Sequence, residues 1–305
     1  MSSAGDPLPG LPSSIAIREV GPRDGLQPEG PVPVAARVRL VNALVDAGVS
    51  IIEVAAFVSP KAVPAMAGAA DLMAALPRSP AVRHVALVPN VKGAELAAEA
   101  GVDALTLTVS ASEAYSQRNV RMSVEDSLAQ VAAIRAAIGG DLPLDTVISC
   151  AFGSPYEGDL DPRAVADLGR RALASGSTSL TFADTTGMAT PRRVRDLLAE
   201  TGTDVGLHLH DTRGTALVNA YAALEAGVTR FDTAVGGLGG SPFAAGAGGN
   251  LATEDLVHLC DDLGIATGID LDALLAVSSQ VAETVGHPVP SRIAAAGPRS
   301  RLHPG

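Results

Sequence analysis

Two histidines separated by one residue, His208 and His210, end a short apolar run that is typical of a β-strand. Residues i and i+2 of a strand point to the same side, so both imidazoles can reach one metal ion. The other four of the six histidines lie elsewhere, so a general enrichment in histidine does not account for the pair. The alternative is a pair of polar side chains that only hydrogen-bond to a loop. The pattern favours a metal site at the end of this strand.

A second polar group lies near the N-terminus in residues 19–27 (EVGPRDGLQ), where Arg23 and Asp24 are adjacent inside a turn. Alone, the Asp-Gly pair predicts only an Asx turn with a solvated arginine. Together with the two imidazoles, the Asp24 carboxylate supplies a hard oxygen ligand, and this mixture suits Mg²⁺ or Mn²⁺ at a site with open positions. Arg23 would then face the substrate, because a guanidinium stabilises a carbonyl oxygen or a developing enolate.

A glycine-rich run occupies residues 236–249 (GGLGGSPFAAGAGG) and leads into Asn250. A phosphate cradle is one interpretation, but the run lacks both the Lys-Ser/Thr of a P-loop and a GxGxxG spacing after the first strand. We interpret it as a lid loop that closes over a substrate and excludes water, with an ordinary surface loop as the alternative. Asn250 could then supply a fourth metal ligand.

Two further carboxylates, Glu53 and Asp184, stand at the ends of predicted interior strands. Each could be structural and paired with an arginine. Proximity to Arg23 and the metal would favour a role in the site, since an ionised group in a rim of low dielectric constant needs a partner.

These side chains need a scaffold that brings several strand ends to one place. Short apolar, β-branched runs alternate with Ala/Leu-rich helical stretches, the pattern of parallel strands buried on both faces. The predicted strands are 15–20, 51–55, 84–88, 105–109, 146–151, 178–182, 205–210 and 230–235. Helices are predicted between them, for example at 34–47, 124–137, 163–174, 192–200 and 216–226. Eight such units predict a (β/α)8 TIM barrel, whose active site lies at the carboxyl ends of the strands; a doubly wound sheet is the alternative.

The composition narrows the class of protein. The 305 residues, 47% of them hydrophobic, fit one barrel domain over 14–296, with flexible termini at 1–13 and 297–305. The formal net charge of -11 argues against a nucleic-acid partner. No signal peptide or membrane-spanning run is visible, so we expect a cytoplasmic protein without a membrane partner. The two cysteines, Cys150 and Cys260, are expected to be buried reduced thiols.

Several segments together resemble the hydroxymethylglutaryl-CoA lyase family. The similarity runs in family order from about residue 15 to 290. The segments are 19–27 (EVGPRDGLQ), 57–66 (FVSPKAVPAM), 110–119 (SASEAYSQRN), 153–158 (GSPYEG), 183–191 (ADTTGMATP), 208–214 (HLHDTRG) and 236–257. The resemblance implies a metal-dependent TIM barrel that cleaves 3-hydroxy-3-methylglutaryl-CoA to acetyl-CoA and acetoacetate.

By position, the resemblance also assigns roles to individual residues. The metal ligands would be Asp24, His208, His210 and Asn250; the catalytic set would be Arg23, Glu53, Asp184, His210 and Ser241; and substrate binding would involve Arg23, Gln27, Ser110 and Asn119. In this chemistry a base, Asp24 or His210, removes the proton of the substrate's tertiary hydroxyl, whose pKa a bound metal lowers. Arg23 then stabilises the thioester oxygen as it gains charge.

The sequence departs from the family at the glycine-rich loop. Where the family has a cysteine thought to shuttle the proton to the enolate, this chain has Ser241. A thiol titrates near 8.5, whereas an unassisted hydroxyl is far less acidic, and loss of a positioned acid typically costs about 100- to 10,000-fold in rate. Three hypotheses follow: the usual lyase, with water, His210 or an assisted Ser241 as the proton donor; a related metal-dependent aldol or Claisen enzyme acting on another 3-hydroxyacyl-CoA or 2-oxo acid; or a metal-bound barrel that binds a CoA ester or a partner without turnover.

The resemblance implies an acyl-CoA substrate and a possible homodimer. Four basic residues are candidates for contacts with the CoA phosphates, although each alone is more typical of a solvated surface charge: Lys61, Lys92, Arg118 and Arg121.

Overall fold

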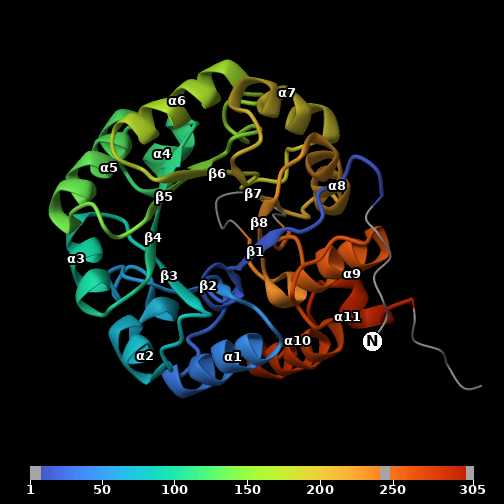
Figure 1. Cartoon of the computed structure of the whole chain (residues 1–305). Helices are drawn as coiled ribbons and strands as arrows, with labels where there is room; N and C mark the ends of the chain where they lie inside the picture. The colour runs from blue at the N-terminus through green and yellow to red at the C-terminus, as the bar shows by residue number, and fades with distance from the viewer. Residues whose placement is uncertain (1–7, 241–247, 300–305) are drawn as a thin grey trace, which may run out of the picture.

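The structure is a computed structural model that describes residues 8–240 and 248–299. Eight parallel strands form a closed barrel in the order β1 to β8, and β1 pairs with β8 to complete it. Figure 1 shows the strands at the centre and the helices in a ring around them. The strands are β1 (Ala16–Glu19), β2 (Ile51–Ala56), β3 (Arg83–Leu87), β4 (Ala104–Ser110), β5 (Leu144–Ser149), β6 (Ser179–Ala183), β7 (Gly206–His208) and β8 (Arg230–Thr233). The predicted TIM barrel is confirmed, and each predicted strand bound lies within two residues of the observed one.

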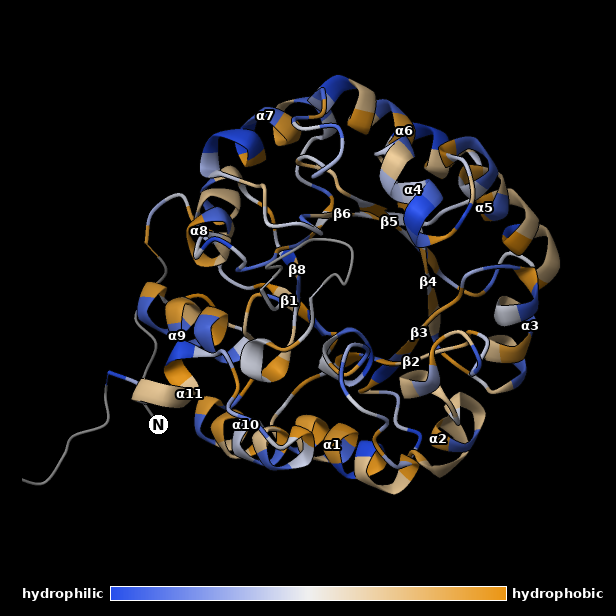
Figure 2. Ribbon diagram, turned by 180° about the vertical axis from the view of Figure 1, so that it is seen from behind, coloured by the Kyte–Doolittle hydropathy of each residue, from blue (hydrophilic) through white to orange (hydrophobic). Residues whose placement is uncertain are grey.

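Helices follow the strands and cover the barrel. They are α1 (Val34–Asp46), α2 (Ala69–Ala75), α3 (Val91–Glu99), α4 (Glu113–Asn119), α5 (Val124–Ile138), α6 (Pro162–Ala174), α7 (Pro191–Thr201), α8 (Ala216–Ala226), α9 (Thr253–Leu263), α10 (Leu271–Val285) and α11 (Arg292–Ala296). Side-chain oxygens cap several of them, as when Asn90 accepts the backbone N–H of Gly93 at 3.0 Å at the start of α3. The helices turn apolar faces to the strands, and Figure 2 shows hydrophilic residues on the outward faces of α6 and α7.

One predicted strand is shorter than expected, and this changes the setting of the histidines. β7 ends at His208, and His210 lies beyond it in an isolated antiparallel bridge with Asn250. The chain after β8 therefore returns to the carboxyl end of β7, so residues 40 positions apart become neighbours at the barrel mouth.

Two of the predicted segments lie largely outside the described residues. The lid loop falls largely on residues 241–247, and much of the predicted flexible termini on 1–7 and 300–305, all outside the described residues. The domain limits 14–296 stay a prediction. Within the described residues, no helix is long and apolar enough to cross a membrane.

Candidate metal centre and active site

Arg23 and Asp24 lie on a single π-helical turn, Gly21–Gly25, directly after β1. The N–H of Leu26 donates to the Gly21 carbonyl at 2.9 Å and closes the wide turn. Glycine at position 21 leaves room for the buried Glu19, because a Cβ there would lie 2.6 Å from its Oε1. Such turns recur at functional sites, and this one aims both polar side chains into the barrel mouth.

Asp24, His208 and His210 form a group that could hold a divalent metal. One ligand atom from each lies within 4.8 Å of the others. Nε2 of His208 faces Nε2 of His210 at 3.0 Å and Oδ2 of Asp24 at 3.9 Å. Two imidazole nitrogens at this distance repel each other unless a proton or a cation lies between them. The group therefore fits a divalent cation by its donor types as well as by its spacing.

Asn250 joins this group through its amide. Nδ2 donates to Oδ2 of Asp24 at 2.9 Å and to the Leu238 carbonyl at 2.8 Å. Oδ1 is buried and has no hydrogen-bond partner among the described residues. A buried carbonyl oxygen without a partner is unfavourable by about 1–3 kcal/mol, which a bound cation would relieve. Asn250 is therefore suited to be a fourth ligand.

Arg23 is held from two sides. Its Nε donates to Oε2 of Glu53, and Nη1 donates to Oδ1 of Asp24 at 2.6 Å. Oε1 of Glu53 in turn accepts the hydroxyl of Thr106 from β4. Glu53 is buried and paired with Arg23. It therefore has the structural arginine partner that was one prediction, and it also lies next to a residue of the candidate site.

The charges in the group shift one another's pKa. Burial opposes ionisation of Asp24, but Arg23 and the two imidazoles hold the pKa of its carboxyl well below the usual range. Burial, followed by the neighbouring His208, lowers the pKa of His210 to about 4. Burial acts in the same direction on His208, but its hydrogen bond to Asp232 and the charge of Asp24 raise its pKa. His210 is thus neutral at pH 7 and offers a lone pair.

Asp184 lies at the end of β6, beside this group but bonded elsewhere. Its Oδ1 accepts the backbone N–H groups of Met188 and Ala189 at 2.6 and 2.9 Å, and its own N–H donates to the His208 carbonyl at 2.8 Å. Burial raises the pKa of Asp184 to about 7. Within the described residues its side-chain bonds stabilise its own loop, and no bond links it to Arg23 as its predicted proximity suggested.

The predicted substrate-binding residues lie further out. Ser110 is buried, and its hydroxyl closes its own turn with the backbone of Ser112. Gln27 and Asn119 are exposed, and no bond printed for the described residues ties either side chain to the metal group. Ser241 lies outside the described residues. The four candidate CoA-phosphate partners are all exposed, namely Lys61, Lys92, Arg118 and Arg121.

Three side chains that support the site were not identified from the sequence. Asp232 of β8 contacts His208, Arg18 of β1 contacts Asp232, and Thr106 contacts Glu53. The available signal was a charged residue inside a predicted buried strand, which Arg18 and Asp232 both are. Glu19, the neighbour of Arg18 on β1, does not join the group and accepts the backbone N–H groups of Gly21 and Val235.

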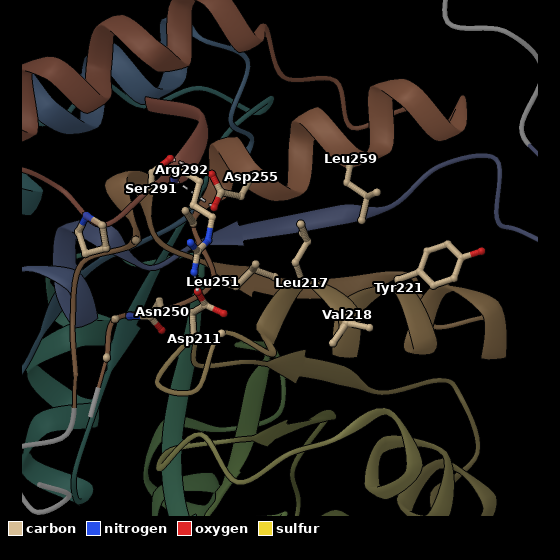
Figure 3. A pocket seen from close by; sticks show the side chains of 16 residues that line it. Asp211, Leu217, Val218, Tyr221, Asn250, Leu251, Asp255, Leu259, Ser291 and Arg292 are labelled. Carbon is tan, nitrogen blue, oxygen red and sulfur yellow. Dashed lines mark hydrogen bonds and ion pairs between the residues drawn. The ribbon is translucent and has the colours of Figure 1, made fainter. Parts of the chain in front are cut away.

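A separate cavity of about 650 Å³ lies outside the barrel, between α8, α9 and the start of α11. Figure 3 shows Leu217, Val218 and Tyr221 along one wall, with Asp211 and Arg292 facing each other at one end, 3.4 Å apart. Asn250 is the single metal-group residue that lines it. This cavity therefore adjoins the barrel mouth and shares Asn250 with the metal group.

The sequence matches the HMGL-like family over residues 14–281. The chain belongs to the hydroxymethylglutaryl-CoA lyase family. It is 43% identical over 293 residues to the 3-hydroxy-3-isohexenylglutaryl-CoA/hydroxy-methylglutaryl-CoA lyase of Pseudomonas aeruginosa, covering 94% of this chain and 98% of that protein. To the human mitochondrial hydroxymethylglutaryl-CoA lyase it is 39% identical, over 94% of this chain and 90% of that protein.

A solved structure of an HMG-CoA lyase from Acinetobacter baumannii, in complex with coenzyme A and 3-methylmalate, superimposes with a TM-score of 0.91. It is 42% identical in sequence and covers 96% of this chain and 98% of that one. Membership of this family makes the chain a carbon–carbon lyase of the hydroxymethylglutaryl-CoA lyase type, as the sequence motifs predicted.

Proposed function

We propose that the chain cleaves 3-hydroxy-3-methylglutaryl-CoA to acetyl-CoA and acetoacetate with Mg²⁺ or Mn²⁺ held by Asp24, His208, His210 and Asn250. The convergence of these four side chains beside Arg23 is the observation that carries the proposal. The names of the relatives and the coenzyme A in the A. baumannii structure support an acyl-CoA substrate. The homodimer and the cytoplasmic location remain predictions.

The protein groups divide the work around the reacting atoms. A bound divalent metal supplies Lewis acidity, which lowers the pKa of the substrate hydroxyl. Both oxygens of Asp24 already accept hydrogen bonds, from Arg23 and Asn250, whereas His210 is neutral at pH 7. A neutral imidazole has one lone pair, so His210 can accept the hydroxyl proton only when that lone pair does not bind the metal; the proposed base is therefore Asp24 or His210.

Arg23 is the group suited to the charge that develops on the thioester oxygen. Glu53 and Asp24 fix its Nε and Nη1, so Nη2 is the guanidinium nitrogen that has no bond to another described residue. A donor fixed in advance stabilises a developing oxyanion without reorganisation during the reaction. Proton delivery to the enolate carbon is the proposed role of Ser241, assisted by a neighbouring group or replaced by water or His210.

A second candidate substrate has a bulkier group at C3. The P. aeruginosa relative is named for 3-hydroxy-3-isohexenylglutaryl-CoA as well as for the methyl compound. The same metal group, Arg23 and proton transfers would serve either substrate, because the reacting atoms are the same.

The experiment is a panel of CoA thioesters incubated with purified protein and followed by mass spectrometry. Cleavage of hydroxymethylglutaryl-CoA is expected with added Mn²⁺ or Mg²⁺, to be abolished by EDTA and restored by excess metal. Undiminished cleavage in EDTA would refute the metal site. Cleavage of a different thioester alone would move the function to that substrate, and binding without cleavage would identify a binding protein.

A further inference from the structure

A cluster of three ionised side chains lies inside the barrel, one layer below the metal group. Arg18 of β1 donates through Nε and Nη2 to Oδ1 and Oδ2 of Asp232, at 2.8 and 2.7 Å. Its Nη1 donates to Oδ2 of Asp145 on β5 at 2.9 Å. Both carboxylates are buried, and the arginine side chain is 13% exposed. The two-pronged contact fixes the plane of the Asp232 carboxylate.

Asp232 is the member of this cluster that reaches the metal group. Its Oδ2 lies 3.2 Å from Nδ1 of His208, and Nε2 of the same ring faces His210 and Asp24. An ionised carboxylate accepts a hydrogen bond from Nδ1–H and donates none, so it selects the tautomer with hydrogen on Nδ1 and a lone pair on Nε2. That is the tautomer a metal ligand at Nε2 requires.

Asp145 provides the contrast within the same cluster. It accepts hydrogen bonds from Arg18, from Ser179 at 2.6 Å and from Thr181 at 2.8 Å, and no bond in the described residues joins it to a histidine. The two aspartates thus share a cation and a buried setting, but Asp232 alone of the two contacts a metal ligand.

We propose that Asp232, clamped by Arg18, is a positioning residue that fixes the tautomer and ring orientation of His208 for metal binding. The inference rests on the proposed function, because it concerns the same metal group. Replacement of Asp232 by asparagine places an N–H₂ group beside either Arg18 or His208. Beside His208 it donates to Nδ1, moves the hydrogen to Nε2 and removes the lone pair from the metal position.

The test compares Asp232→Asn with Asp145→Asn, a matched control in the same cluster. Mn²⁺ affinity is measured by electron paramagnetic resonance, and the tautomer of His208 is read from ¹⁵N chemical shifts of labelled histidine. Asp232→Asn is expected to weaken Mn²⁺ binding about 10- to 100-fold and to shift His208 away from the Nδ1–H tautomer. Asp145→Asn is expected to keep the tautomer and to change affinity by about threefold or less.

Other outcomes separate the inference from the proposed function. Equal losses of affinity in both variants, with the tautomer unchanged, would overturn the inference, since a purely structural cluster predicts that result. An Nε2–H tautomer in the wild-type protein would overturn it even if Asp232→Asn does not fold. Arg18→Lys keeps the charge but loses the two-pronged contact, and a drop in Mn²⁺ affinity below that of Asp145→Asn is expected. Failure of the wild type to bind Mn²⁺, with the Nδ1–H tautomer in place, would refute the proposed metal site instead.

Discussion

Two regions of the barrel mouth differ in how their polar side chains are held. In the buried foot of the site, made of Arg23, Asp24, Glu53, His208 and Asp232, each side chain is bonded to a polar group from another strand or turn. On the exposed rim, made of Gln27, Lys61, Arg118 and Asn119, the side chains lie in solvent. Arg118 stacks over Tyr156 at 4.2 Å, a contact that both partners make at the surface. Groups fixed before the substrate arrives can stabilise a transition state, whereas solvated groups contribute mainly to binding.

The largest loss of activity is expected from a substitution in the buried foot of the site. Arg23→Gln removes the charge that faces the thioester oxygen and leaves the buried Glu53 carboxylate without its cation. We expect kcat to fall by about 100- to 1,000-fold while the protein remains folded, because this is the typical cost of losing one oxyanion donor.

Steady-state kinetics on hydroxymethylglutaryl-CoA with saturating Mn²⁺ measures this loss. Arg78→Gln is the control, since Arg78 also pairs with an aspartate, Asp103, but at an exposed position before β3. If Arg23→Gln keeps more than about a tenth of the wild-type kcat, Arg23 does not stabilise the developing charge.

The foot also shows what could be read from the sequence and what could not. The barrel was predictable because eight buried strands leave eight apolar runs, and a strand end is marked by the first polar residues after each run, such as His208. The partner of His208 was not predictable. Arg18 and Asp232 are 214 residues apart, and they meet only because β1 closes the barrel against β8 in a particular register.

The sequence also does not show which of two neighbouring charged residues on β1 belongs to the site. Arg18 points into the barrel, whereas Glu19 points to the outside and binds the backbone of Val235 at 2.8 Å. Side chains alternate along a strand, so a shift of one residue decides which of two adjacent charges joins the site. The sequence contained both charges but gave no register. The exposed rim residues carried no strand pattern that could position them.

Another buried carboxyl group, that of Glu254, lies at the base of the glycine-rich loop. Both oxygens of Glu254 accept the N–H of Gly236, at 2.9 and 3.0 Å, and burial raises the pKa of Glu254 from 4.5 to about 7. Between these values the folded protein holds a proton that the unfolded chain has lost. This contribution to stability is complete below pH 4.5 and is lost as the pH rises through 7.

Glu254→Gln removes this dependence. The variant should gain stability relative to the wild type as the pH rises from about 5 to 8, by about 1–3 kcal/mol in the free energy of unfolding. Thermal unfolding followed by circular dichroism across this range measures the difference, with the exposed Glu283→Gln as control. A gap that stays constant or shrinks as the pH rises contradicts the raised pKa.

The smallest kinetic effects are expected from substitutions at the exposed rim, which test whether solvated side chains contribute only to substrate binding. Gln27 and Asn119 were predicted to bind substrate, and both are exposed. Gln27→Ala and Asn119→Ala should each raise KM by about two- to tenfold, the worth of one neutral hydrogen bond, and leave kcat nearly unchanged because binding is lost equally in the ground and transition states. Gln117→Ala, on the same helix as Asn119 and bonded to Glu113 at 2.9 Å, is the control. A fall in kcat of about 100-fold in either rim variant would place that residue in the foot, and the exposure of a side chain in this structure would then be no guide to its role in the reaction.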